Sequence, residues 1–184
     1  MTDTWSDIEA RLQQLYALPH NQVWLRDQRR AAADVVAAKI EELKSGIIGT
    51  PQREEFLGPK VFLRVVGPAN PAYGGNWWFD SAVLDRLDGA YSRISFQPSE
   101  LDDVIRNHLR EALTVRTEWN PITEIWSLPS GERLTGWTGA GARQPLIGGL
   151  LLSAAGNRML VGGVRQVWYP VKNPLWVQLH RNLH

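Results

Sequence analysis

Arg64 is the residue of this chain whose position most invites a chemical explanation. It interrupts the apolar run V-F-L-R-V-V-G, residues 61–67, which predicts a central strand because both faces are otherwise apolar. Burying a charge without a partner costs several kcal/mol, so Arg64 must be paired. An acid such as Glu118 or Glu124 is one such partner. A bound anion in a cleft is the other, because a planar guanidinium matches phosphate oxygens.

Gln166 is the second candidate, in the stretch L-V-G-G-V-R-Q-V-W-Y-P, residues 160–170. The adjacent Gly162 and Gly163 weaken a strand unless another backbone or a ligand needs the room. If Gln166 faces the same cleft as Arg64, the glycines make room for a dinucleotide. If it faces away, they form only a bulge, and the stretch gives no support to an enzyme.

Aromatic side chains form the third candidate group, in a chain with nine tryptophans. In N-W-W-F, residues 76–79, adjacent tryptophans on a strand point to opposite faces. One of Trp77 and Trp78 can therefore be core while the other stacks on a ligand. Core packing of both is the plainer interpretation.

Several other chemistries lack the residues they need. The absence of cysteine excludes a thiol nucleophile, and no G-x-S-x-G motif marks an activated serine. The stretch T-G-A-G-A-R-Q-P, residues 138–145, lacks the G-K-[ST] of a phosphate loop, so it indicates a turn or a close backbone approach to a ligand. Four scattered histidines show no metal-ligand spacing; they are His20, His108, His180 and His184.

Nucleic acid and membrane have no electrostatic support, because the formal net charge is only +1. A nuclease is a further alternative, suggested by Arg106, His108 and Arg110, but the polar face of an amphipathic helix explains these residues. No signal peptide and no apolar run of membrane-spanning length is visible. These features predict a cytoplasmic protein, or one exported by a route without a cleaved signal peptide.

Together, F-L-R-V-V-G, N-W-W-F, Y-S-R-I-S and G-G-V-R-Q-V-W-Y-P resemble the ADP-ribosyltransferase-like fold. They resemble especially its bacterial toxin members, which transfer ADP-ribose or hydrolyse NAD. L-P-S-G-E-R-L-T-G-W-T-G-A-G-A-R-Q-P, residues 128–145, is similar to the turn, strand and small-residue loop that precede the last of these strands in such domains. The likeness covers residues 60–180.

The resemblance implies NAD as substrate and no metal, because cleavage of the nicotinamide–ribose bond depends mostly on positioning and electrostatics. It implies that Arg64 places the phosphates or the adjoining ribose and that Gln166 contacts the ribose. The implied substrate-binding residues are Trp78, Phe79, Tyr91, Ser92 and Gly163. A protein acceptor or an immunity or antitoxin protein would be the partner.

Gln166 departs from the strongest form of the pattern because a neutral amide stabilises a cationic transition state less than a carboxylate does. Transfer, plain hydrolysis of NAD and loss of activity therefore all stay open. The competing hypothesis is a non-catalytic α+β protein-interaction module. In that module the tryptophans are core and interface, Arg64 is a structural ion pair and Gln166 is an ordinary strand residue.

The elements that must position these residues follow a helices-first order, and 184 residues suit one domain. We expect an N-terminal helical hairpin over 1–46, a linker over 47–59 and, over 60–184, a mixed, mainly antiparallel sheet with helices. The hairpin comprises a helix from Ser6, with a Ser6–Glu9 capping box, and one long helix over 21–46.

In the α+β part the patterns predict a short helix near 81–87, a strand over 91–96 and an amphipathic helix capped by Ser99. The remaining strands are expected at 122–128, 132–138, 146–152, 158–169 and 174–180.

Overall fold

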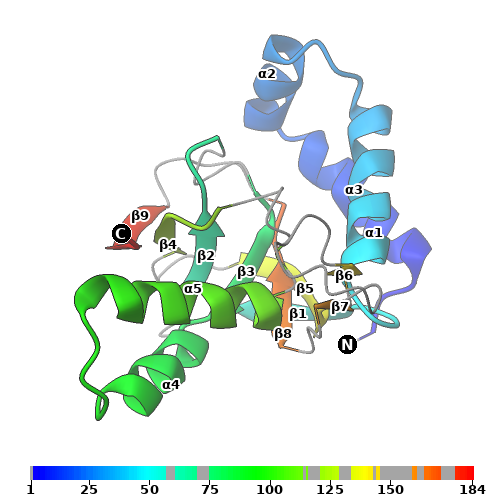
Figure 1. Ribbon diagram of the computed structural model, residues 1–184. Coiled ribbons are helices and arrows are strands. Elements are labelled where there is room, and N and C mark those ends of the chain that lie inside the picture. Colours follow the sequence, from blue (N-terminus) through cyan, green and yellow to red (C-terminus); the bar gives the residue numbers. More distant parts are fainter. Residues whose placement is uncertain are drawn as a thin grey trace.

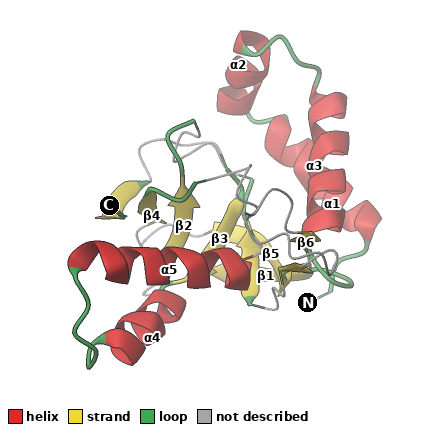
Figure 2. Ribbon diagram, in the orientation of Figure 1, coloured by secondary structure: helices red, strands yellow, loops and turns green. Residues whose placement is uncertain are grey.

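The chain is an α+β protein, which confirms the predicted class; the residues that the structure describes form five helices and a seven-stranded antiparallel sheet (Figures 1 and 2). The computed structural model describes residues 2–56, 61–69, 75–113, 115, 121–128, 134–142, 144–145, 159–160, 164–170 and 177–184. The predicted strand over 146–152 and Gly163 lie outside the described residues.

The first helix, α1, spans Trp5–Tyr16, and its N-cap, Thr4, lies two residues before the predicted cap, Ser6. Its capping box is formed by Thr4 and Asp7. The Thr4 hydroxyl accepts from the Asp7 N–H at 3.2 Å, and the Asp7 carboxylate accepts from the Thr4 N–H at 2.9 Å. The predicted Ser6–Glu9 box is therefore wrong. Thr4 and Asp7 have the same spacing, and they come first along the chain.

The predicted long helix over 21–46 is wrong, because two helices occupy this range. Helix α2 spans Pro19–Asp27 and α3 spans Ala32–Gly46. Arg29, between them, has a φ of 51°, a left-handed conformation in which a right-handed helix cannot continue. The alanine-rich sequence favours a helix locally, so the break comes from packing: Leu25 of α2 and Val35 of α3 are both buried in the same core.

The predicted linker over 47–59 contains a strand. Strand β1, Gln52–Phe56, pairs antiparallel with β5, Leu134–Ala140, at one edge of the sheet. Its sequence, Q-R-E-E-F, is mostly charged, as is common for edge strands. That composition is why the sequence suggested a linker.

The sheet order is β1-β5-β8-β3-β2-β4-β9. The strand that carries Arg64, β2, lies between β3 and β4, so its predicted central position is confirmed. The bounds are Phe62–Val66 for β2, Trp77–Asp80 for β3, Glu124–Leu128 for β4, Arg165–Trp168 for β8 and Gln178–Asn182 for β9. A separate pair consists of β6, Gln144–Pro145, and β7, Met159–Leu160.

Two helices, α4 over Ala82–Tyr91 and α5 over Pro98–Leu113, follow β3. The predicted strand over 91–96 is wrong, because Tyr91 still belongs to α4 and the next residues connect the helices. Ser99 is not the cap. Helix α5 begins at Pro98, which suits a first helical position, and the Glu100 carboxylate accepts from the Gln97 N–H at 3.0 Å.

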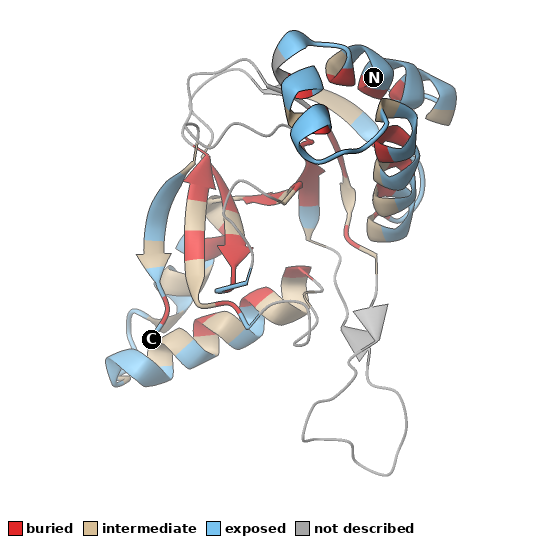
Figure 3. Ribbon diagram, turned by 90° about the horizontal axis from the view of Figure 1, so that it is seen from above, coloured by how far each residue is buried: buried red, intermediate tan, exposed pale blue. Residues whose placement is uncertain are grey.

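Among the described residues, the buried apolar side chains form three clusters. Figure 3 marks the buried positions in red along the helices and strands. Helices α4 and α5 pack on β2 and β3 through residues such as Leu63, Phe79 and Ile105. Helices α1 to α3 share a second cluster with Trp137 of β5 and Trp168 of β8. The third cluster includes Phe62, Trp78, Leu128, Val167 and Tyr169.

Candidate functional site

Arg64 is partly buried on β2, opposite Trp126 of β4. Its guanidinium lies against Gly75, the residue two before β3, where a β-carbon would collide with it. Burial lowers the pKa of Arg64 to about 10, and the negative charge of Glu42 partly offsets this effect. The guanidinium is therefore charged at neutral pH.

Gln166 is a core residue, with 6% of its surface exposed. Its side-chain Nε2 donates to the backbone oxygen of Leu113, the last residue of α5, at 3.1 Å. The same amide leaves no room for a side chain at Gly141. Gln166 therefore satisfies a helix C-terminus, which is a structural task.

Arg64 and Gln166 lie on opposite faces of the sheet, so the structure does not bring them together in a cleft. Leu63 pairs with Phe79, and Phe79 pairs with Gln166, which places these three side chains in one row on one face. Arg64 directly follows Leu63 and therefore points to the other face. A dinucleotide site shared by Arg64 and Gln166 would require both side chains to face one cleft. Because they do not, the stretch over residues 160–170 gives no support to such a site.

The two tryptophans of β3 are both packed. Trp78 is buried in the third cluster, and Trp77, on the other face, packs against the cluster of α1 to α3 and contacts Gly46. Phe79 is buried on the side of α4 and α5. The plainer interpretation, core packing of both tryptophans, agrees with this arrangement.

Tyr91 and Ser92 lie at the end of α4 and contact local partners. The Tyr91 hydroxyl is 2.5 Å from Nε2 of His108 on α5, and its ring meets Phe96 edge-on. The Ser92 hydroxyl donates to the Gly89 carbonyl at 2.9 Å. The residues predicted to bind substrate are therefore divided between the core and a helix corner.

A carboxylate that the sequence did not single out occupies the junction between α3 and the sheet. Both oxygens of Glu42 accept from Nδ2 of Asn76 at 2.8 Å. Oε1 also accepts from Trp168 Nε1 at 3.2 Å, and Oε2 from Lys39 Nζ at 2.8 Å. We call Glu42, Lys39, Asn76 and Trp168 the Glu42 cluster.

The electrostatics of the Glu42 cluster favour an ionised carboxylate. Burial alone raises the pKa of Glu42, but the charge of Lys39 and the hydrogen bonds from Lys39, Asn76 and Trp168 outweigh it and leave the pKa below its ordinary value. Burial, assisted by the charge of Glu42, raises the pKa of Tyr16 to about 12. Within the described part of the chain, Asn76 Oδ1 and the Tyr16 hydroxyl have no hydrogen-bond partner although both are buried.

Sequence reasoning missed Glu42 because E-E-L-K on an amphipathic helix is typical of a solvent-facing turn. Its partners are 34 and 126 residues away along the chain, at Asn76 and Trp168. No local spacing relates these positions, so only the folded chain brings them together.

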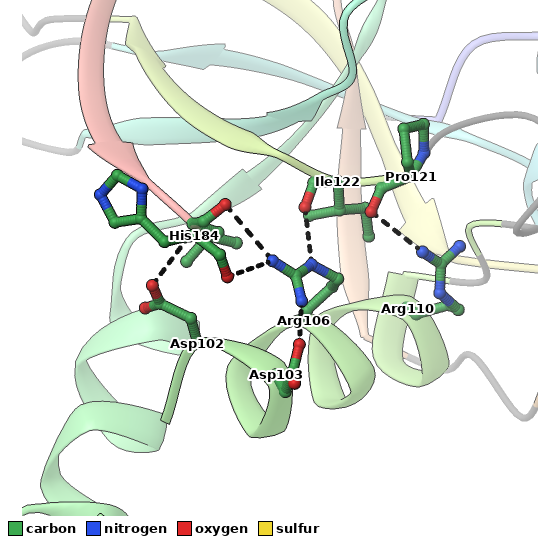
Figure 4. A network of polar contacts seen from close by, with 8 residues as sticks. Asp102, Asp103, Arg106, Arg110, Pro121, Ile122 and His184 are labelled. Atoms are coloured by element: carbon green, nitrogen blue, oxygen red, sulfur yellow. Dashed lines mark hydrogen bonds and ion pairs between the residues drawn. The ribbon is translucent and has the colours of Figure 1, made fainter. Parts of the chain in front are cut away.

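The arginines that suggested a nuclease join α5 to other elements (Figure 4). Arg106 donates to the carbonyl oxygens of Ile122, Leu183 and His184 at 2.9, 3.3 and 3.1 Å. Arg110 donates to Val115 and Pro121 carbonyls at 3.1 and 3.3 Å. A structural role accounts for both side chains.

A hollow lies on the sheet where β1 ends its pairing with β5. Its volume is about 350 Å³, and its polar lining comes from Thr50, Gln52, Thr138 and Arg165. Arg165 is the one charged residue in the lining of this hollow. Arg165 directly precedes Gln166 on β8, so the residue of this strand that lines the hollow is the arginine and not the predicted Gln166.

Among the residues that the structure describes, no group of three or more acidic or histidine side chains is placed to hold a metal ion. None of the described helices combines the length and apolar character needed to cross a bilayer. No protein-family model matches the chain, and a search of curated proteins finds no match.

Proposed function

We propose that this chain is a non-catalytic α+β protein-interaction module. The observation that carries the proposal is the position of Gln166, which is buried on the opposite face of the sheet from Arg64 and bonded to the Leu113 carbonyl. Gln166 thereby has a structural explanation, as the module hypothesis expects. The proposal then needs a surface to which another chain can add.

The edge of the sheet formed by β9 is such a surface. In the described part of the chain β9 pairs with β4 on one side only, whereas the opposite edge strand, β1, is bridged by Thr2. Leu179 of β9 is a large apolar side chain with 47% of its surface exposed. An exposed edge offers unpaired backbone groups to an extended peptide, which can add as a further strand.

The β9 edge is also held in place from behind. Arg181 makes two hydrogen bonds with the Asp88 carboxylate of α4, at 2.9 and 2.6 Å. Asp102 of α5 accepts from the His184 N–H at 2.9 Å, next to the carbonyls bound by Arg106 (Figure 4). A fixed template loses little conformational entropy on binding, which favours strand addition.

The test is affinity capture with the intact chain and two matched variants. Leu179→Lys places a charge on the edge, and Leu18→Lys makes the same change at a similarly exposed leucine, 44%, between α1 and α2. We expect a partner captured by the wild type to be lost with Leu179→Lys and kept with Leu18→Lys. Hydrogen exchange should show protection of residues 178–182 in the complex. Capture that is unaffected by Leu179→Lys would contradict the proposal.

An NAD-consuming activity is the second candidate, and the Glu42 cluster is the observation that favours it. Glu42 is close enough to Arg64 to affect its pKa, and its side chain is 30% exposed. Glu42 would supply the carboxylate that position 166 lacks, for stabilising an oxocarbenium-like ribose. NAD would be the substrate, without a metal, and a protein acceptor or an immunity protein would be the partner.

Incubation with NAD separates the two candidates. The module proposal expects neither nicotinamide release nor an NAD-dependent rise in melting temperature, with or without cell extract as a source of acceptors. Nicotinamide release that is abolished by Glu42→Gln and by Arg64→Ala, in variants that keep their fold, would instead establish the second candidate.

A further inference from the structure

The hollow beside β5 arises from an irregularity in the edge of the sheet. The last ladder pair of β1 is Gln52 with Thr138, and the next bridge joins Ile47 to Gly141. Residues 48–51 therefore lie opposite only 139–140, so the longer side bulges outward. Gly49 has a φ of 79° in this bulge, a left-handed conformation that glycine adopts readily.

Arg165 faces the hollow because of the same register that turns Gln166 to the core. Ala140 pairs with Arg165, and Thr138 pairs with both Val167 and Gln52. The side chains of these residues therefore share the face opposite Gln166. The side chain of Arg165 is 57% exposed, so its guanidinium is accessible to a ligand.

The guanidinium is held in position yet keeps free donors. Its Nη2 atom donates to Thr138 Oγ1 at 2.9 Å and to the Glu54 carboxylate. Within the described residues, Nε and Nη1 of Arg165 have no hydrogen-bond partner, and the side chains of Thr50 and Gln52 have none either. Arg165 carries the one formal charge in the lining, and its ion-pair partner Glu54 lies beside the hollow without lining it.

We propose that this hollow binds the phosphate monoester of a small hydroxylated molecule. Nη2 of Arg165 is already bonded to Thr138 and Glu54, so Nε and Nη1 would each donate a separate hydrogen bond to the phosphate. The Thr50 hydroxyl and the Gln52 amide would bond to hydroxyl groups of the same ligand. The volume of about 350 Å³ falls within the range of small-molecule sites and exceeds what one phosphate fills.

Titration calorimetry of the intact protein with ribose 5-phosphate, inorganic phosphate and ribose tests this site. We expect ribose 5-phosphate to bind most tightly, inorganic phosphate less tightly and ribose least. Binding of the two phosphates should weaken as salt rises, because their contact with Arg165 is exposed to solvent. Arg165→Gln should weaken ribose 5-phosphate binding by about tenfold or more. The matched control is Arg93→Gln, an exposed arginine in the connection between α4 and α5, which should bind unchanged.

Thr50→Val removes a hydroxyl from an exposed position and leaves the Arg165 contacts intact, so it tests the site even if Arg165→Gln disturbs the fold. It should weaken ribose 5-phosphate more than inorganic phosphate. Equal affinity of the wild type for these two ligands would overturn the assignment of Thr50 and Gln52. Undetectable binding of both, or binding that survives Arg165→Gln unchanged, would overturn the site itself.

Discussion

Arg165 and Gln166 are neighbours on β8, yet they occupy the two contrasting faces of the sheet. Gln166 lies on the helix-covered face, buried and bonded to the end of α5, whereas Arg165 is largely exposed on the other face beside a hollow. Strand alternation alone separates them. The role of a polar residue in such a motif therefore depends on the face of the sheet on which the strand register places it.

The largest loss of stability is expected at Trp168, on the helix-covered face of the sheet. Trp168 is fully buried between β8 and the N-terminal helices. Trp168→Ala should lower the free energy of unfolding by about 3–5 kcal/mol, because it leaves a large cavity and removes a donor from Glu42. Urea unfolding followed by circular dichroism measures this loss. A cost below that of Arg165→Gln would show that α1 to α3 are not packed on the sheet as described.

A carboxylate at position 166 should make the stability of the protein depend on pH. Gln166→Glu replaces the amide donor with a carboxylate facing the Leu113 carbonyl, so burial should raise its pKa in the folded state. A raised pKa means that the variant is most stable below the unfolded-state pKa and loses stability as pH rises through the folded-state value. We expect a loss of about 3 kcal/mol at high pH relative to low pH, measured by urea unfolding across the pH range. A pH-independent loss would contradict the burial of this side chain.

Glu42 gives the opposite pH dependence in the wild type. Its pKa is lowered in the folded state, so its stabilisation is present above the ordinary value of 4.5 and disappears as pH falls through the folded-state pKa. Glu42→Gln should cost about 1–2 kcal/mol near neutral pH and should remove part of the acid sensitivity. Unfolding free energies of both proteins from about pH 7 to about pH 3 check this expectation. Parallel curves would mean that Glu42 makes no charge-dependent contacts.

The smallest effect on stability is expected at Arg165, on the exposed face of the sheet. Arg165→Gln removes a half-exposed pair with Glu54 and should change the free energy of unfolding by less than about 1 kcal/mol. The same change is the one expected to abolish most ligand binding in the hollow. Thermal unfolding without ligand measures the first effect, and a large loss of stability would place Arg165 among the structural residues.

The elements that could be predicted correctly from the sequence are those whose apolar residues repeat over a short range. The strand around Arg64 is central as its doubly apolar pattern indicates, and α5 follows its amphipathic repeat. Strand β1 was mistaken for a linker because edge strands carry charges. The break at Arg29 was missed because alanines on its C-terminal side favour a helix.

The candidate site was harder to predict because its contacts join distant segments. Leu113 is 53 residues from Gln166, and no local pattern indicates that this amide ends α5 rather than facing a ligand. Nor does any spacing connect Glu42 with Asn76. The face of the sheet on which Gln166 lies depends on how β2, β3 and β8 pair, and no pattern in the sequence predicts this pairing.

The shared core of the N-terminal helices and β8 has a consequence for biosynthesis. Asp3 bonds to Trp137, and the buried stripe of α1 and α3 packs on Trp137 and Trp168. These helices leave the ribosome long before the tryptophans that cover them have been synthesised. Until Trp137 and Trp168 have been synthesised, the apolar faces of these helices can pack only on one another, so the part of their core that the two tryptophans cover stays exposed on the nascent chain.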